Sequence, residues 1–399
     1  MTIRTMLVIA LGLGVAAGTG CKKKDDKAAD PGSAAPMADQ GSAAAKAVEE
    51  PPKPAKLNPK TGEEVIAAYK ECTGYVSEGK FDDFKSKCMN DDFKFHMVDA
   101  GDDMTVDAAI DMMKKERVAF PDMKLTPQVI IASGKNILAV SMMTGTNSGP
   151  RHTPMGEMPA TNKKVGMMFF HRVALGEAGG ANEEWMYMDP MTMIGQLGQL
   201  PKEVPPVRPM MDKGLDGAPL TAITADNDAE KKNLDVVAKY TAAVNAHKAA
   251  DAAAFYTDDA FESDQAEATD MKGKKALQDG FTKMWKAFPD FKVDAPATTT
   301  YAAGDFVVQL GTFSGKNDGD LGPKMKKTGK TMSGGFAQIY KMKDGKIAGI
   351  WRFRNGMATA KQLGMMPPMG AAPDAAAGDA KKDDMKKDEM KKDDAKQPE

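Results

Sequence analysis

Residues 183–190 read EEWMYMDP and residues 349–356 read GIWRFRNG, and large apolar side chains alternate in both stretches. Alternation with a period of two is typical of a β-strand. The first strand ends on the carboxylate of Asp189, and the second ends on the amide of Asn355. Two such similar strands, far apart in one chain, indicate that the sequence carries the same fold twice.

Further short matches link the two halves of the chain in the same order. They pair VIAAYKE (65–71) with VVAKYTA (236–242), AFPDMKL (119–125) with AFPDFKV (287–293), TGTNSG (144–149) with LGTFSG (310–315), and GQLG (195–198) with KQLG (361–364). The offsets run from 166 to 171 residues, far longer than the period of a solenoid repeat. We therefore expect two complete copies of one domain, in residues 61–200 and 231–368, joined by a Pro-rich linker at 201–230.

Each copy combines helical and strand patterns. An apolar stripe of Val65, Tyr69, Cys72 and Val76 predicts an amphipathic helix at the start of copy one. Second helices are expected at 105–118 and 271–287, and strands in copy one at 123–132, 136–145, 165–174 and 183–189. Asp-Gly within KDGK (343–346) predicts a tight hairpin in copy two. Helices followed by an antiparallel meander predict an α+β fold, a curved sheet with helices packed on one face.

The ordered set of motifs resembles the SnoaL-like branch of the nuclear-transport-factor-2-like superfamily. The shared string is FPD, TGT…G, MPATNKKV (158–165), an aromatic strand, W-x-x-x-D and a terminal helix with QLG. Copy two keeps most of it. The resemblance implies two tandem cone-shaped domains, each a curved antiparallel sheet packed with helices around an apolar pocket. Family members include ester cyclases, isomerases and proteins without chemistry, so the pocket has to decide the function.

The resemblance implies a chemical role for Asp189. In the cyclase members an Asp at this strand end acts as general acid and base, without metal or cofactor. Trp185 and Tyr187 share its strand face, so we expect them to line the pocket and raise its pKa by desolvation. The alternative is that Asp189 caps the following helix, with Pro190 at the first helical position. Asn355 can cap a helix but cannot act as a base, so copy two is expected to be degenerate.

His171 is the second candidate catalytic residue. It lies in the strand MMFFHRV (167–173) and shares a face with Phe169. Cyclases of the family have a His and a Gln in the corresponding strand, and copy two offers Gln338 at the matching position. The resemblance therefore implies a hydrogen-bond donor to an enolate oxygen, with a His at the sheet margin as the alternative. Phe169, Trp185 and Tyr187 are the candidate ligand-binding residues.

The two ends of the chain differ in composition from the repeats. Residues 1–21 combine Arg4, a short apolar run and Cys21. They resemble a bacterial lipoprotein signal, in which the cysteine is lipidated, and an ordinary cleaved signal is the alternative. Residues 22–60 and 369–399 hold few large apolar side chains and predict a disordered tether and a disordered charged tail. We expect a protein of the bacterial cell envelope, lipid-anchored in the membrane and facing the periplasm or the exterior.

Cys72 and Cys88 are the remaining cysteines. In an oxidising compartment we expect them to form a disulfide, with two buried free thiols as the alternative. A formal net charge of −2 gives no basic field for nucleic acid. The His and Cys residues lack metal-ligand spacing, so we expect neither metal nor cofactor. The 32 methionines also suit Cu(I), although methionine is more simply a core filler.

These features predict a protein that binds a small apolar or amphipathic ligand in domain 1. Cyclase-type or isomerase-type chemistry retained through Asp189 is a further expectation for that domain. The alternative is a structural envelope protein whose sheets pair with a second copy as a homodimer and whose pockets are filled by its own side chains. An open cavity beside Asp189 would separate these hypotheses.

Overall fold

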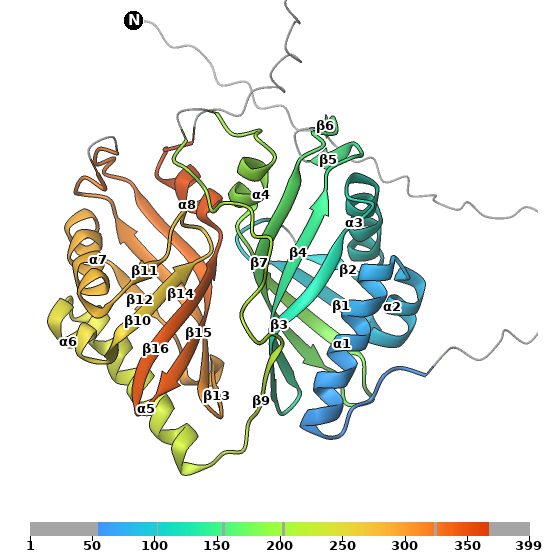
Figure 1. Ribbon diagram of the computed structural model, residues 1–399, viewed down its shortest axis with the longest axis horizontal. Helices are drawn as coiled ribbons and strands as arrows, with labels where there is room; N and C mark the ends of the chain where they lie inside the picture. Colours follow the sequence, from blue (N-terminus) through green and yellow to red (C-terminus); the bar gives the residue numbers. More distant parts are fainter. Residues whose placement is uncertain (1–54, 102, 154–155, 202–203, 323–324, 367–399) are drawn as a thin grey trace, which may run out of the picture. The chain divides into compact units, whose positions relative to one another are not determined.

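The computed structural model describes residues 55–101, 103–153, 156–201, 204–322 and 325–366. All of them belong to one compact unit. Their helices and strands form two successive sets in nearly the same order, which we call domain 1 and domain 2 (Figure 1). The expected signal, Cys21 and the charged tail lie outside the described residues.

Domain 1 begins with two helices and ends with a short one after its last strand. Its elements are α1 (Gly62–Glu78), α2 (Phe81–Cys88), β1 (Met89–Met97), β2 (Met104–Thr105), α3 (Val106–Ala119), β3 (Lys124–Ser133), β4 (Asn136–Thr146), β5 (Arg151–Thr153), β6 (Gly156–Met158), β7 (Lys164–Leu175), β8 (Ala181–Tyr187) and α4 (Pro190–Gln196). The main sheet has the order β2-β1-β8-β7-β4-β3-β9. Strand β9 (Leu220–Ile223) comes from the linker and pairs parallel with β3.

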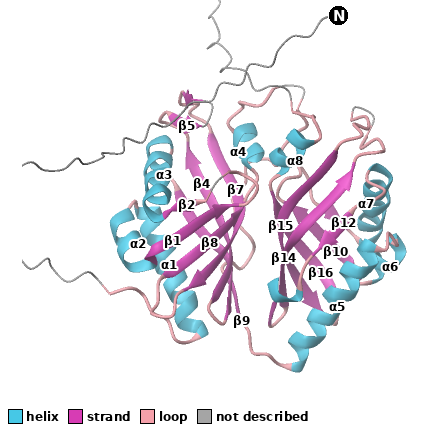
Figure 2. Cartoon of the chain, turned by 180° about the vertical axis from the view of Figure 1, so that it is seen from behind, coloured by secondary structure: helices cyan, strands magenta, loops and turns pink. Residues whose placement is uncertain are grey.

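Domain 2 repeats this arrangement. Its elements are α5 (Asp228–Asn245), α6 (Ala249–Ala254), β10 (Tyr256–Asp264), β11 (Met271–Lys272), α7 (Lys274–Ala287), β12 (Lys292–Asp294), the 3₁₀ helix η1 (Ala297–Thr299), β13 (Thr300–Ala303), β14 (Phe306–Lys316), β15 (Thr331–Lys343), β16 (Lys346–Arg354) and α8 (Gly356–Gln362). The sheet order is β11-β10-β16-β15-β14-β12, and β13 also pairs with β14. In each domain the helices cover one face of the sheet (Figures 1 and 2).

The opening helix of each domain begins at a capping box. In α1 the Thr61 hydroxyl accepts a hydrogen bond from the backbone N–H of Glu64, whose carboxylate accepts one from the backbone of Thr61. In α5 the pair is Asn227 and Glu230. Such boxes satisfy backbone donors that a helix start leaves free. The predicted apolar stripe is buried at Val65, Tyr69 and Val76, together with Thr73.

The second face of each sheet is also buried. Side chains from β3, β4 and β7 of domain 1 share one apolar core with side chains from β14, β15 and β16 of domain 2, among them Val129, Val140, Phe170, Val308, Ile339 and Phe353. Sheets covered on both faces have continuous apolar strands rather than alternating ones. This explains why seven successive residues of β7, Val165 to His171, are buried.

The α+β class with two tandem sheet-and-helix domains is therefore confirmed. The short helices α2 and α6 were not predicted, because eight and six residues carry little periodicity. Residues 201–230 were expected to be only a linker, and the structure adds β9 to the domain 1 sheet and starts α5 within this range. The edge of β3 offers free backbone groups, and β9 satisfies them.

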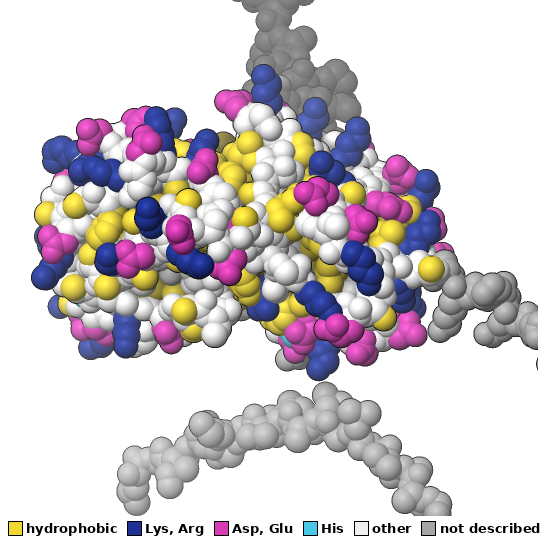
Figure 3. Space-filling model, turned by 90° about the horizontal axis from the view of Figure 1, so that it is seen from below, with side chains coloured by type: hydrophobic (Ala, Val, Ile, Leu, Met, Phe, Trp, Pro, Cys, Tyr) yellow, Lys and Arg dark blue, Asp and Glu magenta, His cyan; other side chains and the backbone are white. Residues whose placement is uncertain are grey.

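The surface carries charges of both signs. Figure 3 shows Lys and Arg side chains interspersed with Asp and Glu side chains over the face that it views, in line with the near-zero net charge. Within the described ranges, no helix combines the length and the apolar character that crossing a bilayer requires.

Candidate functional site

Domain 1 contains a cavity of about 210 Å³ between its helices and its sheet. The walls come from α1, α2, α3, β1, β7 and β8. They are mostly apolar, and include Val76, Phe93, Met113, Met167, Phe169 and Met186. The expectation of an apolar pocket with Phe169 in its wall therefore agrees with the geometry.

His171 and Glu184 place a polar pair in this apolar wall. Both line the cavity and both are buried. The carboxylate of Glu184 on β8 contacts Nδ1 of His171 on β7. A carboxylate at Nδ1 favours the proton on that nitrogen and leaves Nε2 for another partner. Among the described residues, Nε2 has no hydrogen-bond partner although it is buried.

Tyr69 from α1 lies on the same side of the cavity. Its ring meets the His171 ring edge-on, with 6.2 Å between the ring centroids. The Tyr69 hydroxyl is 2.8 Å from the Ser141 hydroxyl on β4. Burial raises the pKa of Tyr69 well above its ordinary value, so the phenol stays protonated at neutral pH. From the sequence, Tyr69 was predicted only as part of the apolar stripe of the first helix, and its place beside His171 was not predicted.

Asp189 does not line this cavity, contrary to the expectation that it faces the pocket. It is 1% exposed and caps α4. One carboxylate oxygen accepts hydrogen bonds from the backbone N–H and the hydroxyl of Thr192, at 3.0 and 2.8 Å. The other accepts from the N–H of Met191 and, across to α8, from the N–H of Met357, each at 3.3 Å. The geometry is that of the capping alternative.

Trp185 and Tyr187 also lie away from the cavity, since they share the strand face of Asp189. Tyr187 belongs to the core between the two sheets. The indole of Trp185 stacks on His96 at 4.9 Å and lies 4.5 Å from the Arg172 guanidinium. The opposite strand face, with Met186 and Met188, lines the cavity instead. Both faces of β8 are apolar, so alternation alone could not tell which one meets the cavity.

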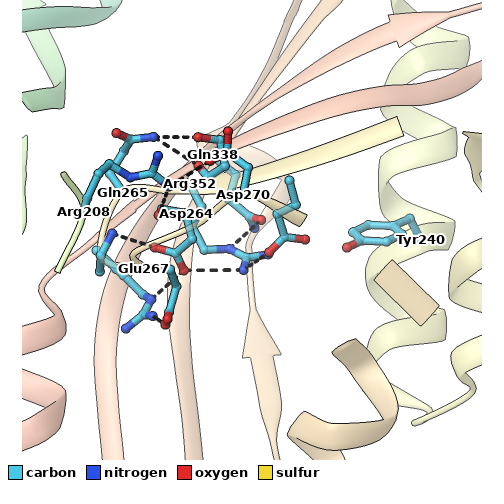
Figure 4. Close-up of polar contacts among 12 residues, drawn as sticks. Arg208, Tyr240, Asp264, Gln265, Glu267, Asp270, Gln338 and Arg352 are labelled. Carbon is cyan, nitrogen blue, oxygen red and sulfur yellow. Dashed lines mark hydrogen bonds and ion pairs between the residues drawn. The ribbon is translucent and has the colours of Figure 1, made fainter. Parts of the chain in front are cut away.

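Domain 2 contains a larger cavity, of about 490 Å³. Five charged side chains of β10, β16 and the loop after β10 line it, namely Glu262, Asp264, Glu267, Arg352 and Arg354. Figure 4 shows Asp264, Glu267, Gln338 and Arg352 drawn together by hydrogen bonds and ion pairs. Domain 2 was expected to be degenerate, and it nevertheless holds a cavity with more charged groups than that of domain 1.

Each arginine is held by two or more partners. Nη1 of Arg352 contacts the Glu262 carboxylate and lies 3.7 Å from Asp264, while its Nε donates to Gln338 at 3.1 Å. Nε of Arg354 donates to Asp264 at 2.8 Å, and its Nη2 donates to Glu267 at 2.5 Å. The two guanidinium groups are therefore fixed in position.

The acids of this cluster titrate differently. Burial would raise the pKa of Asp264, but Arg354 and Arg352 outweigh it and hold that pKa below its ordinary value. Burial is the larger effect at Glu262 and raises the pKa of that carboxyl. The cluster thus keeps Asp264 ionised most firmly.

The strand registers show that equivalent positions of the two domains carry different side-chain chemistry. Phe95 pairs with Met104 on β2, and Glu262 pairs with Met271 on β11. Met97 faces Met186 across β1 and β8, whereas Asp264 faces Arg352 across β10 and β16. Two residues further along lie Met188 and Arg354. One phenylalanine and three methionines of domain 1 thus correspond to two acids and two arginines of domain 2: Phe95 to Glu262, Met97 to Asp264, Met186 to Arg352 and Met188 to Arg354.

This difference is visible in the sequence, in the strand residues that precede Asp189 and Asn355. Asn355 caps α8, with its side-chain oxygen accepting from the N–H of Ala358 at 2.9 Å. Asp189 and Asn355 therefore both cap a helix, and the difference between them is a difference between two capping residues. The informative difference was RFR at 352–354 against MYM at 186–188.

Two other expectations concern the cysteines and metals. In the structure a disulfide joins Cys72 of α1 to Cys88 of α2, with 6.0 Å between their Cα atoms. No group of three or more His, Cys, Asp or Glu side chains able to hold a metal ion is found among the residues that the structure describes.

Comparison with known proteins supports the duplicated fold. The family model described as SnoaL-like polyketide cyclase matches residues 63–197 and again residues 234–363. No match was found among curated proteins.

Solved structures similar to this chain each cover about one domain of it. A protein described as a SnoaL-like polyketide cyclase from a Jannaschia species is 14% identical and covers 36% of this chain and 99% of its own, with a TM-score of 0.33. A protein with a ketosteroid isomerase-like fold from Catenulispora acidiphila is 17% identical, with coverages of 35% and 98% and a TM-score of 0.29. A nuclear-transport-factor-2-like protein from Burkholderia xenovorans is 17% identical, with coverages of 34% and 97% and a TM-score of 0.29.

Proposed function

The chain belongs to the SnoaL-like polyketide cyclase family, and we propose that it binds a small apolar or amphipathic ligand in the domain 1 cavity. The observation that carries the proposal is His171, whose buried Nε2 has no partner among the described residues and which lines an apolar cavity. A buried polar atom without a hydrogen bond costs free energy. A ligand with an apolar body and one polar group supplies the missing partner.

The same pair gives domain 1 a means of acid–base chemistry. Glu184 orients the imidazole through Nδ1. Nε2 can then take a proton from a carbon between two carbonyl groups, or donate a hydrogen bond to the resulting enolate oxygen. We propose that cyclase-type or isomerase-type turnover in domain 1 runs through His171 and not through Asp189, without a cofactor.

Binding of uncharged carbonyl compounds tests this proposal. A panel of small hydroxyaryl ketones and enolisable β-dicarbonyl compounds, whose O–H group can donate to Nε2, is expected to raise the melting temperature of the full chain. His171→Phe keeps the site apolar but removes Nε2, so it should weaken binding about tenfold, the worth of one hydrogen bond. Ala68→Phe adds a ring at the cavity wall and should abolish binding.

Asp189→Asn is the matched control, because Asp189 lies outside the cavity walls, and it should bind the panel as the unchanged protein does. Equal binding by the Ala68→Phe variant, or no binding by any member of the panel, would overturn the proposal. Turnover that survives His171→Phe but is lost in Asp189→Asn would restore Asp189 as the base.

We further propose that the chain works in the bacterial cell envelope, anchored by lipid on Cys21. The sequence around Cys21 and the Cys72–Cys88 disulfide support this, since disulfides persist in oxidising compartments. In a bacterial host the protein should fractionate with membranes and carry a diacylglyceryl mass on its mature N-terminus. Cys21→Ser should release it into the soluble fraction, and a soluble unchanged protein would contradict the anchor.

The alternative of a structural envelope protein has less support. It expects pockets filled by the chain's own side chains and sheets free to pair with a second copy. Both domains have open cavities. The sheet faces that could form a homodimer are packed against each other within this one chain.

A further inference from the structure

The charged cluster of domain 2 exposes Arg352 and Arg354 to the cavity more than Glu262 and Asp264. The side chains of Glu262 and Asp264 are only 4% and 7% exposed, while those of Arg352 and Arg354 are 24% and 18% exposed. All four line the cavity. Glu262 and Asp264 therefore lie behind the guanidinium groups and hold them in place, so a ligand in the cavity meets the two arginines and the more exposed Glu267.

Each guanidinium also has a terminal nitrogen outside the internal contacts. Gln338 and Glu262 engage Nε and Nη1 of Arg352, which leaves Nη2. Asp264 and Glu267 engage Nε and Nη2 of Arg354, which leaves Nη1. Within the described ranges no further hydrogen bond to these groups is found. Two fixed arginine donors on neighbouring positions of one strand face suit the two oxygens of a carboxylate.

The remainder of the cavity is apolar and aromatic. Its walls include Phe281, Met284, Phe288, Phe291, Phe313 and Phe336. Such walls favour the burial of a hydrocarbon or aromatic body at about 25 cal/mol per Å² of apolar surface. A purely apolar ligand would cover the guanidinium groups without replacing their water, which is costly.

We propose that the domain 2 cavity binds an amphipathic organic acid. Its carboxylate lies on Arg352 and Arg354, and its apolar body lies against the phenylalanine-rich wall. Domain 1, with Met186 and Met188 at the equivalent positions, takes uncharged ligands. The duplicated chain therefore carries two sites of different ligand chemistry.

Glu267 is the group that such a ligand displaces. Its side chain is 61% exposed, in contrast to the buried Glu262 and Asp264, and its only ion pair in the described residues is with Arg354. An exposed pair contributes little to stability, so a ligand carboxylate can take its place on Arg354. Lys283, exposed on α7, adds a further positive charge at the cavity wall.

A set of ligands that differ only in charge tests the proposal. Calorimetric titration of the full chain would compare 4-phenylbutyrate, 4-phenylbutanamide and 4-phenylbutylamine, with octanoate, octanamide and octylamine as a second set. We expect each carboxylate to bind at least tenfold more tightly than its amide, and each amine to bind most weakly. Equal binding of carboxylate and amide in both sets, or tighter binding of the amines, overturns the proposal.

Variants then assign the binding to domain 2. Glu267→Gln removes the competing carboxylate and should tighten carboxylate binding severalfold. A fourfold variant that installs the domain 1 residues should retain the fold, as judged by circular dichroism, and lower carboxylate binding to the level of the amide; it combines Glu262→Phe, Asp264→Met, Arg352→Met and Arg354→Met. Should it fail to fold, Glu267→Gln still decides, because unchanged or weaker binding in that variant contradicts the proposal.

Ala68→Phe separates this site from the one in domain 1. Ala68 lines the domain 1 cavity, so its enlargement should leave carboxylate binding unchanged while it abolishes binding of uncharged carbonyl compounds. Carboxylate binding that is lost in Ala68→Phe would place the acid in domain 1 and refute the inference, whatever the outcome for the uncharged panel.

Discussion

Asp189 shows how one side chain can serve two helices. Its carboxylate caps α4 and also accepts a hydrogen bond from the first turn of α8 in the other domain. Asn355 holds the equivalent position, caps α8 and donates its amide N–H to the carbonyl of Asp99 at 3.0 Å. At the scale of the residue, the two copies therefore share a side-chain oxygen that accepts hydrogen bonds from backbone N–H groups.

This role predicts a pH-dependent effect of Asp189→Asn on the free energy of unfolding. Burial raises the pKa of Asp189. A carboxyl whose pKa is raised in the folded state stabilises the fold below its unfolded pKa and loses that contribution as pH rises through the folded pKa. Asn does not titrate. In urea denaturation the variant should therefore gain stability relative to the unchanged protein as pH rises above about 4, the ordinary pKa of Asp.

The reciprocal change, Asn355→Asp, is the matched control. It places a carboxyl where the structure uses an amide donor to Asp99, so it should destabilise the chain increasingly as pH rises. Removal of the acceptor altogether, in Asp189→Ala, should cost about 1–2 kcal/mol. A difference between Asp189→Asn and the unchanged protein that is constant with pH would contradict the assigned environment.

At the scale of the element, long periodic segments could be predicted and short or doubly buried ones could not. The helix expected at 105–118 is α3 at Val106–Ala119, and the strand expected at 136–145 is β4 at Asn136–Thr146. Strand β9 was not predicted, since its four residues form a strand only by pairing with the edge of β3.

Strand β8 shows why Trp185, Tyr187 and Asp189 were expected in the cavity and lie outside it. Its alternation gave two faces correctly, with Trp185 and Tyr187 on one and Met186 and Met188 on the other. Both faces are apolar, because the first packs against the core between the sheets and the second lines the cavity. Hydrophobicity orients a strand only when one face meets water, so here the orientation follows from packing against the second domain.

At the scale of the whole molecule, the shared core makes each domain part of the other's stability. Phe170 of β7 and Phe353 of β16 are both fully buried, with 6.0 Å between their ring centroids. Neither domain could bury these strand faces alone. Large exposed apolar faces are unfavourable in water, so we expect the described part of the chain to unfold in a single cooperative transition.

Phe353→Ala tests this coupling. Loss of a buried phenylalanine should cost about 3–5 kcal/mol. Hydrogen exchange of the β7 amides, in domain 1, should accelerate together with that of the β16 amides, although the substitution lies in domain 2. Val118→Ala, at an exposed position of α3, is the control and should change neither. If the β7 amides keep their protection while the β16 amides lose it, the two domains unfold independently. The apolar site and the charged site would then be joined only by the chain and not by the shared core.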